Sequence, residues 1–533
     1  MKAGLLLLVL LGAGSLHCDA AADAVSVEPI DDLQWLFIED TVALISPPSA
    51  EVGVQARELM ERAAAARASG ALSEMRRALA QARVILAGGE WNAANAFVAS
   101  LAIRPHETAI DSSAPAVIEI GQYFQTKPPS LDPITLDIGL RSWRPRPPPA
   151  QDIVWHARAM ARSTDFSESP VISVLSFRDV ADGAYELVVR ASQRGDVLGT
   201  TAKRVFVVAH LQRDLQVIET RAAALTLTPA MQASIAYPAD LVRGLNDRSR
   251  QVRSTDVRAL IDRAQRLLDA AEANADPLTR AKGSVERHYW LAEAGRYEPF
   301  RLIVPPAWDG RARLPLVVVL HGSNGNHDSV LSNPGVIEQA QARGWAVLSP
   351  MGYSPNSGWG NHLPVVLANG TQPRPRPSTI AGIVLPQDGV DPEPAERDVL
   401  RTIALVRAEY PIDGRRIYLL GNSMGGEGTW HLAARFPGLW AAVAPAAGAI
   451  APEHYPYAAL GKLPVLAVHG QGDTIVAYDA SRDMVERLER QGGNARLLRV
   501  IDGGHDAVYK VLPDVFNFFA RHARRDEGSA DVR

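Results

Sequence analysis

The pattern of apolar and polar positions changes character along the chain. Apolar residues at helix-face spacing come first, alternating strand-like runs follow, helical spacing then returns, and strands and helices finally alternate. These changes predict a helical N-terminal region over 25–110, a β-sandwich over 112–210, a helical linker region over 211–288 and an α/β domain over 289–525. A polar tail over 526–533 follows.

The region 112–210 carries the clearest strand pattern. After the turn pair Asp182-Gly183, alternation places Tyr185, Leu187 and Val189 on one face of a strand. Short strands separated by turn signals at this spacing are typical of a β-sandwich, and we predict an immunoglobulin-like one.

From residue 289 onward, short apolar runs alternate with amphipathic helical stretches. The run Leu316–Leu320 is fully apolar, as a parallel strand covered on both faces requires. This alternation predicts a doubly wound open sheet with helices on both faces. A proline-rich stretch over 351–394 interrupts it, and loops of this length usually carry function. We expect it to overhang the edge of the sheet.

A serine lies between a predicted strand and a predicted helix. The stretch Gly421–Gly426 reads Gly-Asn-Ser-Met-Gly-Gly, follows the strand Arg416–Leu420 and precedes the helix Glu427–Arg435. It is a G-x-S-x-G pattern in the strand–turn–helix context that exposes a serine hydroxyl. Ser423 is therefore the candidate nucleophile. The alternative is a serine that merely caps the helix.

A nucleophilic serine needs a general base, and the base needs an orienting carboxylate. Asp473 lies in the loop after the predicted strand Val465–Val468, and His505 lies in the loop after Leu497–Val500. The carboxyl ends of parallel strands share one edge of an open sheet, where ligands bind. We therefore predict Asp473 as the acid and His505 as the base that serve Ser423.

The oxyanion that forms during acyl transfer should be held by backbone N–H groups. One candidate is Met424, the residue after the nucleophile, and the other lies in the loop after Leu316–Leu320. We place the second donor at Ser323, with Gly322 as the near alternative.

Other polar side chains lie close to these motifs. Asp502 and Asp506 flank His505 and compete for the role of acid, but they are too near in sequence to reach the ring as easily as a residue from the preceding loop. Trp359 and His362 lie in the long stretch over 351–394. They are candidates for contact with substrate, and simple packing of the loop is the alternative.

With these motifs in place, residues 298–525 resemble the α/β-hydrolase superfamily. Within it they are similar to secreted esterases related to polyhydroxybutyrate depolymerases and feruloyl esterases, with prolyl-oligopeptidase-like hydrolases as neighbours. The resemblance implies a serine esterase of the carboxylesterase type (EC 3.1.1) with Ser423, His505 and Asp473 as its triad. It rests on His321–Ser323, Gly421–Gly426 with Gly428–Trp430, Gly470–Asp473 with Val476, and Gly503–His505.

Two alternatives remain open. A prolyl-oligopeptidase-like serine peptidase would use the same triad, but such enzymes usually carry a β-propeller, and no repeat of about 40–50 residues precedes residue 289. A polymer- or glycan-binding protein with an incidental hydrolase domain would bind polysaccharide or polyester through aromatics of the β-sandwich. Trp143 and Trp155 are the candidates for that surface.

Composition narrows the function classes. Among 533 residues, 55 Lys+Arg against 59 Asp+Glu give a net charge of −4, which argues against a nucleic-acid partner. The histidines are not at metal-ligand spacing, and there is no phosphate-binding loop, so we expect no cofactor and no metal. The expected partner is a small-molecule or polymer-linked ester.

The N-terminus predicts export. Lys2 precedes the unbroken apolar run Leu5–Leu11, and Ala22-Asp23-Ala24 offers a small-x-small cleavage site, so we predict a signal peptide over 1–24. The apolar run is too short to span a membrane. The single cysteine, Cys18, offers the alternative of a lipoprotein, although His17 stands where lipoprotein signals have a small residue.

Overall fold

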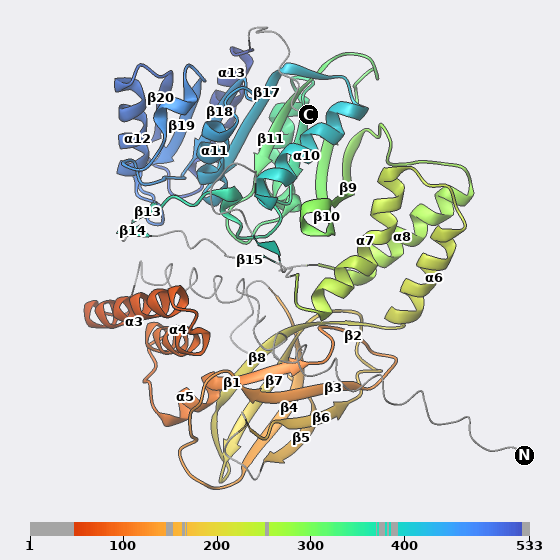
Figure 1. Cartoon of the computed structure of the whole chain (residues 1–533), viewed down its shortest axis with the longest axis vertical. Coiled ribbons are helices and arrows are strands. Elements are labelled where there is room, and N and C mark those ends of the chain that lie inside the picture. Colours follow the sequence, from red (N-terminus) through yellow and green to blue (C-terminus); the bar gives the residue numbers. More distant parts are fainter. Residues whose placement is uncertain are drawn as a thin grey trace, which may run out of the picture.

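The computed structural model describes residues 47–144, 153–161, 166, 168–250, 255–368, 370–372, 379–380, 383–384 and 393–524. The predicted signal peptide, Cys18 and the polar tail lie outside the described residues. In Figure 1 the α/β part lies at the top, a β-rich part lies at the bottom, and a group of helices lies on the right between them.

The helices of the N-terminal part end earlier than predicted. They are α3 (Ala50–Ala68), α4 (Leu72–Leu86) and α5 (Ala93–Ser100). Helices α3 and α4 pack against each other through a small apolar cluster of their own that includes Leu59, Met75 and Leu79. The first strand begins at Leu101, inside the region 25–110 that helix-face spacing had assigned to helix. Runs of alternating residues this short, such as Ala109–Asp111, give too little periodicity to be recognised.

The β-rich part is built from a smaller and a larger sheet that share one core. Alternate residues of β3, β4 and β7, for example Ile120, Ile138 and Val189, are buried between the sheets. The immunoglobulin-like assignment stays a prediction. In spatial order the smaller sheet holds β1 (Leu101–Pro105), β3 (Ala116–Gln122) and β6 (Val171–Leu175), and the larger holds β2 (Ala109–Asp111), β8 (Asp196–Val208), β7 (Gly183–Gln193), β4 (Ile134–Ser142) and β5 (Val154–Ala161).

The helical linker packs against both neighbouring parts. It consists of α6 (Leu211–Ala223), α7 (Pro229–Asn246) and α8 (Val257–Glu272). Its apolar core takes in Phe206 from β8 on one side, and Val285 and Tyr297 from the α/β part pack against it on the other. Tertiary packing of amphipathic faces, more than helix propensity, holds such helices in place.

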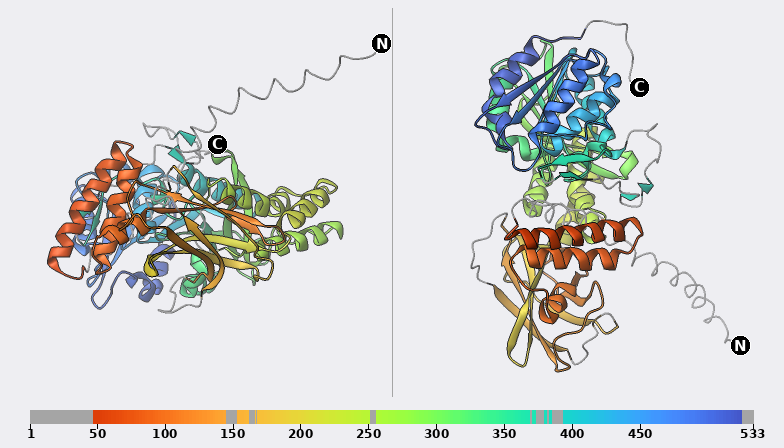
Figure 2. Two further views of the ribbon diagram at one scale, coloured as in Figure 1. Left: turned by 90° about the horizontal axis from the view of Figure 1, so that it is seen from below. Right: turned by 90° about the vertical axis from the view of Figure 1, so that its left-hand side faces the viewer.

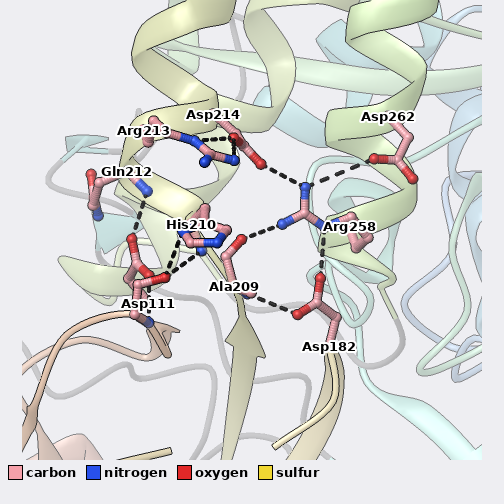
Figure 3. Close-up of polar contacts among 10 residues, drawn as sticks. Asp111, Asp182, Ala209, His210, Gln212, Arg213, Asp214, Arg258 and Asp262 are labelled. Carbon is pink, nitrogen blue, oxygen red and sulfur yellow. Dashed lines mark hydrogen bonds and ion pairs between the residues drawn. The ribbon is translucent and has the colours of Figure 1, made fainter. Parts of the chain in front are cut away.

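An ion-pair network fastens the linker to the β-sheets (Figure 3). The Arg258 guanidinium on α8 pairs with Asp182 at 2.6 Å and with Asp214 on α6 at 2.8 Å. Beside it, the Asp111 carboxylate at the end of β2 accepts the N–H of Gln212 in the first turn of α6 at 3.0 Å. Arg258 thus joins the turn before β7 to both helices.

The α/β part contains one mixed sheet. In spatial order its strands are β9 (Gly283–Leu291), β10 (Arg296–Val304), β12 (Ala346–Pro350), β11 (Leu314–Leu320), β17 (Ile412–Asn422), β18 (Ala442–Ala446), β19 (Val465–Gly470) and β20 (Ala495–Val500). Strand β10 is antiparallel to both of its neighbours, and the strands from β12 to β20 are parallel. The carboxyl ends of the parallel strands therefore meet at one edge.

Helices cover both faces of this sheet, as the alternating pattern predicts (Figure 2). One apolar core lies between the sheet and α10, α11 and α12, and the other lies under α9 and α13. The sheet is thus doubly wound. The helices are α9 (Pro334–Gln341), α10 (Pro394–Glu409), α11 (Met424–Arg435), α12 (Tyr478–Arg490) and α13 (Leu512–Ala520), with 3-10 turns η1 (Ala292–Ala294), η2 (His327–Ser332), η3 (Gly358–Gly360), η4 (Tyr457–Leu460) and η5 (Ala507–Lys510).

The long stretch after β12 contains short strands of its own. They are β13 (Val365–Leu367), β14 (Gly370–Gln372), β15 (Thr379–Ile380) and β16 (Ile383–Val384). Strand β13 forms bridges to Ile450, in the loop after β18, and to Val476, in the loop after β19. This part of the stretch therefore crosses the carboxyl edge of the sheet. In the part of the chain that the structure describes, no helix is both long and apolar enough to cross a membrane.

A carboxyl group in the core of this domain has an unusual environment. Asp398 on α10 is 0% exposed and accepts hydrogen bonds from the Tyr289 hydroxyl at 2.7 Å and from the Gly352 N–H. Burial, and then the charge of Glu298, raise the pKa of Asp398 to about 7. A carboxylate at a helix start would be favoured by the helix dipole alone. The helix dipole does not explain why Asp398 is fully buried.

Asp398 should make stability depend on pH. An unfolded aspartate ionises near pH 4, whereas the folded one keeps its proton until about pH 7, so the folded state binds more protons between these values. The free energy of unfolding should therefore fall as pH rises through this window, by up to about 1.4 kcal/mol per pH unit from this group. We expect Asp398→Asn, which mimics the protonated acid, to lack this decline. Urea titrations of both proteins at pH 5 and pH 8 measure it, and parallel declines in the two proteins would contradict the assignment.

Candidate active site

Ser423 occupies a strained turn between β17 and α11. Its backbone has φ 61° and ψ −125°, in the left-handed region that a residue with a Cβ rarely adopts. Such strain costs on the order of 1–3 kcal/mol and persists only where the surroundings enforce it. The Ser423 N–H donates to the Ala446 carbonyl at 2.9 Å, and α11 begins at the next residue. The turn thus holds the serine at the carboxyl edge of the sheet.

Close backbone approach explains the small residues of this turn. A Cβ at Gly421 would lie 2.2 Å from the carbonyl oxygen of Gly425, and one at Gly425 would lie 2.3 Å from that of Leu320. A Cβ at Gly426 would lie 2.2 Å from the carbonyl oxygen of Ala446. Only glycine permits such contacts, so β11, β17, β18 and α11 can meet tightly beneath the serine.

The structure brings the predicted acid and base together. Nδ1 of His505 lies 2.8 Å from Oδ2 of Asp473, and the Asp473 side chain is 0% exposed. The neighbouring residues tie this pair to the serine turn, because Nδ2 of Asn422 donates to Oδ1 of Asp506 at 3.1 Å. Asp506 therefore holds the serine and histidine loops together, and the acid that contacts the imidazole is Asp473.

Asp473 accepts hydrogen bonds from several sides. Oδ1 accepts the backbone N–H groups of Ile475 at 2.8 Å and Val476 at 3.0 Å, while Oδ2 faces His505 and Nε2 of His469 at 3.1 Å. Burial acts to raise the pKa of Asp473, but hydrogen bonds from His469 and His505 outweigh it and hold that pKa well below its usual range. The carboxylate is therefore charged wherever the protein is folded near neutral pH.

His469 is a second histidine on the same carboxylate oxygen. Its Nε2 faces the acceptors Asp473 Oδ2 and the Val476 carbonyl, so this nitrogen carries the proton. Its Nδ1 lies 2.8 Å from the hydroxyl of Ser481 on α12, which donates to it. His469 is almost fully buried. Its contacts are those of a buried histidine that joins α12 to the loop after β19 and donates to Asp473.

Loss of the His469 donor should weaken catalysis by misplacing Asp473. We expect His469→Leu to lower kcat by about 10- to 100-fold, because small displacements of an orienting group have effects of that size. His469→Gln, which keeps an N–H donor near the same place, should retain more of kcat. Ester hydrolysis and thermal unfolding of both variants measure this. An unchanged kcat in a less stable His469→Leu protein would show that the histidine only supports the fold.

The candidate oxyanion donors lie on either side of the serine turn. Met424 is the first residue of α11, so its N–H has no acceptor within the helix. Ser323 follows Gly322, and a Cβ on Gly322 would lie 3.5 Å from that of Ser423. The same loop is held by Asn324, whose N–H donates to the Pro355 carbonyl at 2.9 Å. Among the described residues, the N–H groups of Met424 and Ser323 have no acceptor.

Trp359 is not a substrate-contact residue. Its side chain is 0% exposed, and its Nε1 donates to the His321 carbonyl at 3.1 Å. It lies directly against Gly352 and Gly428, where added Cβ atoms would approach its ring within 2.5 Å. Trp359 therefore packs beneath the loop after β11, which carries Ser323. The prediction of substrate contact was wrong because the length of a loop does not reveal which of its aromatics fold inward.

His362 is partly exposed but engaged. Its Nε2 pairs with Glu393 at 2.6 Å, and its side chain is 29% exposed. The ring of His431 on α11 lies 6.3 Å away and pairs with Glu396. Glu396 also accepts the Glu393 N–H at the start of α10, which is the capping role that its position suggests. Contact between His362 and substrate stays a prediction.

Strand β13 stabilises the loop after β19, which carries Asp473. The Ala368 N–H donates to the Ile475 carbonyl at 2.9 Å, and the Ala477 N–H donates to the Val366 carbonyl at 3.2 Å. An apolar cluster that includes Val476 and Ala449 closes this contact. Within the described ranges, no group of three or more His, Cys, Asp or Glu side chains is placed to hold a metal ion.

Several residues that hold Asp473, His505 and the serine turn in place have no signal in the sequence. The hydroxyl of Ser481 and the amide of Asn422 have no recognisable motif, because they act through contacts between distant elements. His469 is different, because the sequence places it at the end of a strand, directly before the loop that carries Asp473.

The α/β part of the chain is similar to known hydrolases. Residues 302–506 match the model of the Dienelactone hydrolase family. The protein named "Putative esterase NocK" from Nocardia uniformis subsp. tsuyamanensis is 27% identical over 190 residues, which cover 35% of this chain and 48% of that protein. The chain therefore spans about half the length of this curated relative.

Solved structures give only distant similarity. A thermostable esterase is 17% identical, with a TM-score of 0.36 over 80% of this chain and 100% of that one. An S-formylglutathione hydrolase from Agrobacterium tumefaciens is 16% identical, with a TM-score of 0.36 over 45% of this chain and 96% of that one. The match to the Dienelactone hydrolase family lies within the α/β part of this chain, whose strand order and serine turn are those expected of an α/β-hydrolase fold.

Proposed function

We propose that the protein is a carboxylic ester hydrolase that works through an acyl-enzyme on Ser423. The observation that carries this proposal is the 2.8 Å contact between His505 Nδ1 and Asp473 Oδ2, at the sheet edge where the strained Ser423 turn lies. The match to the Dienelactone hydrolase family supports hydrolysis, and the esterase name of the relative favours esters as the substrate class.

The first half of the reaction forms the acyl-enzyme. Because Nδ1 of His505 donates to Asp473, Nε2 is free to accept the proton of the Ser423 hydroxyl. The serine oxygen attacks the ester carbonyl, and the resulting oxyanion accepts the N–H groups of Met424 and Ser323. His505 then gives its proton to the leaving alcohol oxygen as the C–O bond breaks.

The second half releases the acid. Water gives a proton to Nε2 of His505 and attacks the acyl carbonyl, and the same oxyanion donors hold the second tetrahedral intermediate. The bond to Ser423 Oγ breaks, and this oxygen takes the proton back from His505. The buried charge of Asp473 stabilises the imidazolium in both halves and is itself never protonated.

The proposed esterase would cleave an ester bond, whereas the alternative peptidase would cleave an amide bond. Matched substrates with the same acyl group, a p-nitrophenyl ester and a p-nitroanilide, distinguish them. We expect kcat/KM for the ester to exceed that for the anilide by at least about 10³-fold. Comparable cleavage of the anilide would instead favour a peptidase.

Binding of a polymer through the β-sandwich is less favoured. The guanidinium of Arg204 lies 4.0 Å from the ring centre of Trp143, and that of Arg190 lies 4.4 Å from that of Trp155. One face of each tryptophan is therefore covered by a cation, which leaves less aromatic surface for a sugar ring.

We also propose that hydrolysis takes place outside the cytoplasm, from the sequence of residues 1–24 alone. Fractionation of cells that express the full chain should find the esterase activity in the exported fraction. Activity confined to the cytoplasm, with residue 1 or 2 still at the N-terminus, would contradict export.

A further inference from the structure

The loop after β11 lies directly against the serine turn. A Cβ added to Gly322 would lie 3.5 Å from the Cβ of Ser423 and 3.4 Å from the carbonyl oxygen of Asn422. Ser323 is the next residue, one Cα–Cα step of about 3.8 Å further along the loop. A small movement of this loop therefore changes where the N–H of Ser323 lies relative to the serine.

Ser323 is one of the two central residues of a tight turn. The Gly325 N–H donates to the Gly322 carbonyl at 3.0 Å and closes the turn over residues 322–325. The third residue of the turn, Asn324, has φ 62°, in the left-handed region. The two common forms of such a turn differ by a rotation of the peptide between the second and third residues, which also changes ψ of the second. The closing bond does not hold that peptide, so contacts from outside the turn must do so.

These outside contacts come from the loop after β12. The Asn324 N–H lies 2.9 Å from the Pro355 carbonyl and 3.0 Å from Oδ1 of Asn356, and it donates to both. Nδ2 of Asn356 donates to Oδ1 of Asn324 at 3.1 Å. The orientation of the Asn356 amide follows from this geometry, because a backbone N–H can only donate and must meet the amide oxygen. Asn356 therefore binds both the backbone and the side chain of the residue that follows Ser323.

The segment that carries Asn356 is itself anchored. On one side of it, the Gly352 N–H donates to the buried carboxyl of Asp398 on α10. On the other side, the indole N–H of Trp359 donates to the His321 carbonyl at 3.1 Å. Asn356 lies between these two anchors, so its side chain reaches the turn from a support that is fixed on both sides.

We propose that Asn356 is a positioning residue for ester hydrolysis: through Asn324 it holds the turn in the form that presents the Ser323 N–H to the oxyanion. The inference rests on the proposed esterase function, in which Ser323 is an oxyanion donor. Asn356 acts on the turn and not on the substrate, so its loss should weaken binding of the transition state and leave binding of the ester unchanged. The beginning of the stretch 351–394 therefore serves catalysis through the oxyanion donor.

Asn356→Leu, which keeps the size of the side chain and removes its hydrogen bonds, tests this role. We expect kcat for p-nitrophenyl butanoate to fall by about 10- to 100-fold with KM changed by less than about twofold, because a shift of about 1 Å can cost about 10²-fold. The inhibitor 1,1,1-trifluoropentan-2-one carries the same acyl chain, and Ser423 Oγ adds to its carbonyl to form an oxyanion. Its affinity should fall by the same factor as kcat/KM, a parallel that a general loss of stability would not produce.

Two further variants serve as controls. The carboxylate of Asn356→Asp can accept the Asn324 N–H and, after rotation of the Asn324 amide, its NH₂ as well, so this variant should retain most of kcat. Asn361→Leu is the matched control, because Asn361 lies in the same stretch and is 4% exposed. Its side chain bonds the Leu363 carbonyl at 3.2 Å and the Leu363 N–H at 3.0 Å, within the stretch and away from the turn. Asn361→Leu should lower the melting temperature and leave kcat and the affinity for the inhibitor nearly unchanged.

The outcomes separate this inference from the proposed function. A wild-type protein that hydrolyses no ester would contradict the proposed function, and the inference would fall with it. If the wild type is an esterase, an unchanged kcat in folded Asn356→Leu would overturn the inference alone. A lower kcat with unchanged affinity for the trifluoroketone would do the same. If thermal unfolding shows that Asn356→Leu does not fold, Asn356→Ser, whose shorter side chain cannot reach both groups of Asn324, replaces it with the same expected losses.

Discussion

Ser423→Ala should lower the hydrolysis of p-nitrophenyl butanoate by at least about 10⁴-fold, because removing the nucleophile of a serine triad abolishes the covalent route. The variant keeps the Cβ and the strained backbone at φ 61°, so its fold and thermal stability should change little. Steady-state kinetics and thermal unfolding measure both quantities. Ser332→Ala, an exposed serine on η2, is the matched control and should retain full activity.

A Ser423→Ala protein that is folded and retains a tenth or more of the activity would rule out Ser423 as the nucleophile. A variant that fails to fold would be replaced by Ser423→Gly, because glycine adopts the same positive φ without strain. Glycine also lacks the hydroxyl, so the same loss of activity is expected.

Asp473→Asn should lower kcat by on the order of 10⁴-fold, the effect known for a triad whose acid becomes an amide. All the groups around this carboxylate are donors: the two histidines on Oδ2 and the N–H groups of Ile475 and Val476 on Oδ1. An asparagine must point its own NH₂ at one of these pairs. The negative charge is lost in either orientation. With the NH₂ toward the histidines, Nδ1 of His505 must accept, so its proton moves to Nε2, which is then no longer free for the serine proton.

The control for this variant is Asp502→Asn, because Asp502 lies in the same loop as His505 and its side chain is exposed. We expect nearly full activity from it. A larger loss of kcat from Asp502→Asn than from Asp473→Asn would give Asp502 the role of acid and would contradict the geometry described above.

The proximity of Asp473 and His505 could be predicted from the sequence, because the order of the parallel strands brings the loops after them to one edge of the sheet. Each of Ser423, Asp473 and His505 follows an apolar run that becomes a parallel strand, and parallel strands deliver their carboxyl ends to one edge. The structure brings Asp473 and His505 into contact at that edge. The apolar runs predict the strands, and the parallel order of the strands brings their ends together. Residues far apart in the chain could therefore be assigned to one site.

Burial and long-range pairing could not be predicted in the same way. Strand β4 lies between prolines at 133 and 145, which hide the alternation of its residues, although Ile134, Leu136 and Ile138 face the core. Asp398 follows a helix start, where a solvated carboxylate is the ordinary expectation. Its contact with Tyr289 depends on a strand that lies more than one hundred residues earlier.

The proposed mechanism requires Ser423 as the attacking group, with the oxyanion of the intermediate held between two backbone amides. A crystal structure of the protein after reaction with an alkyl fluorophosphonate tests this most directly. The account predicts phosphorus bonded to Ser423 Oγ, with the phosphonyl oxygen about 3 Å from the N–H groups of both Met424 and Ser323. Phosphorus on another side chain, or a phosphonyl oxygen turned away from both amides, would contradict it.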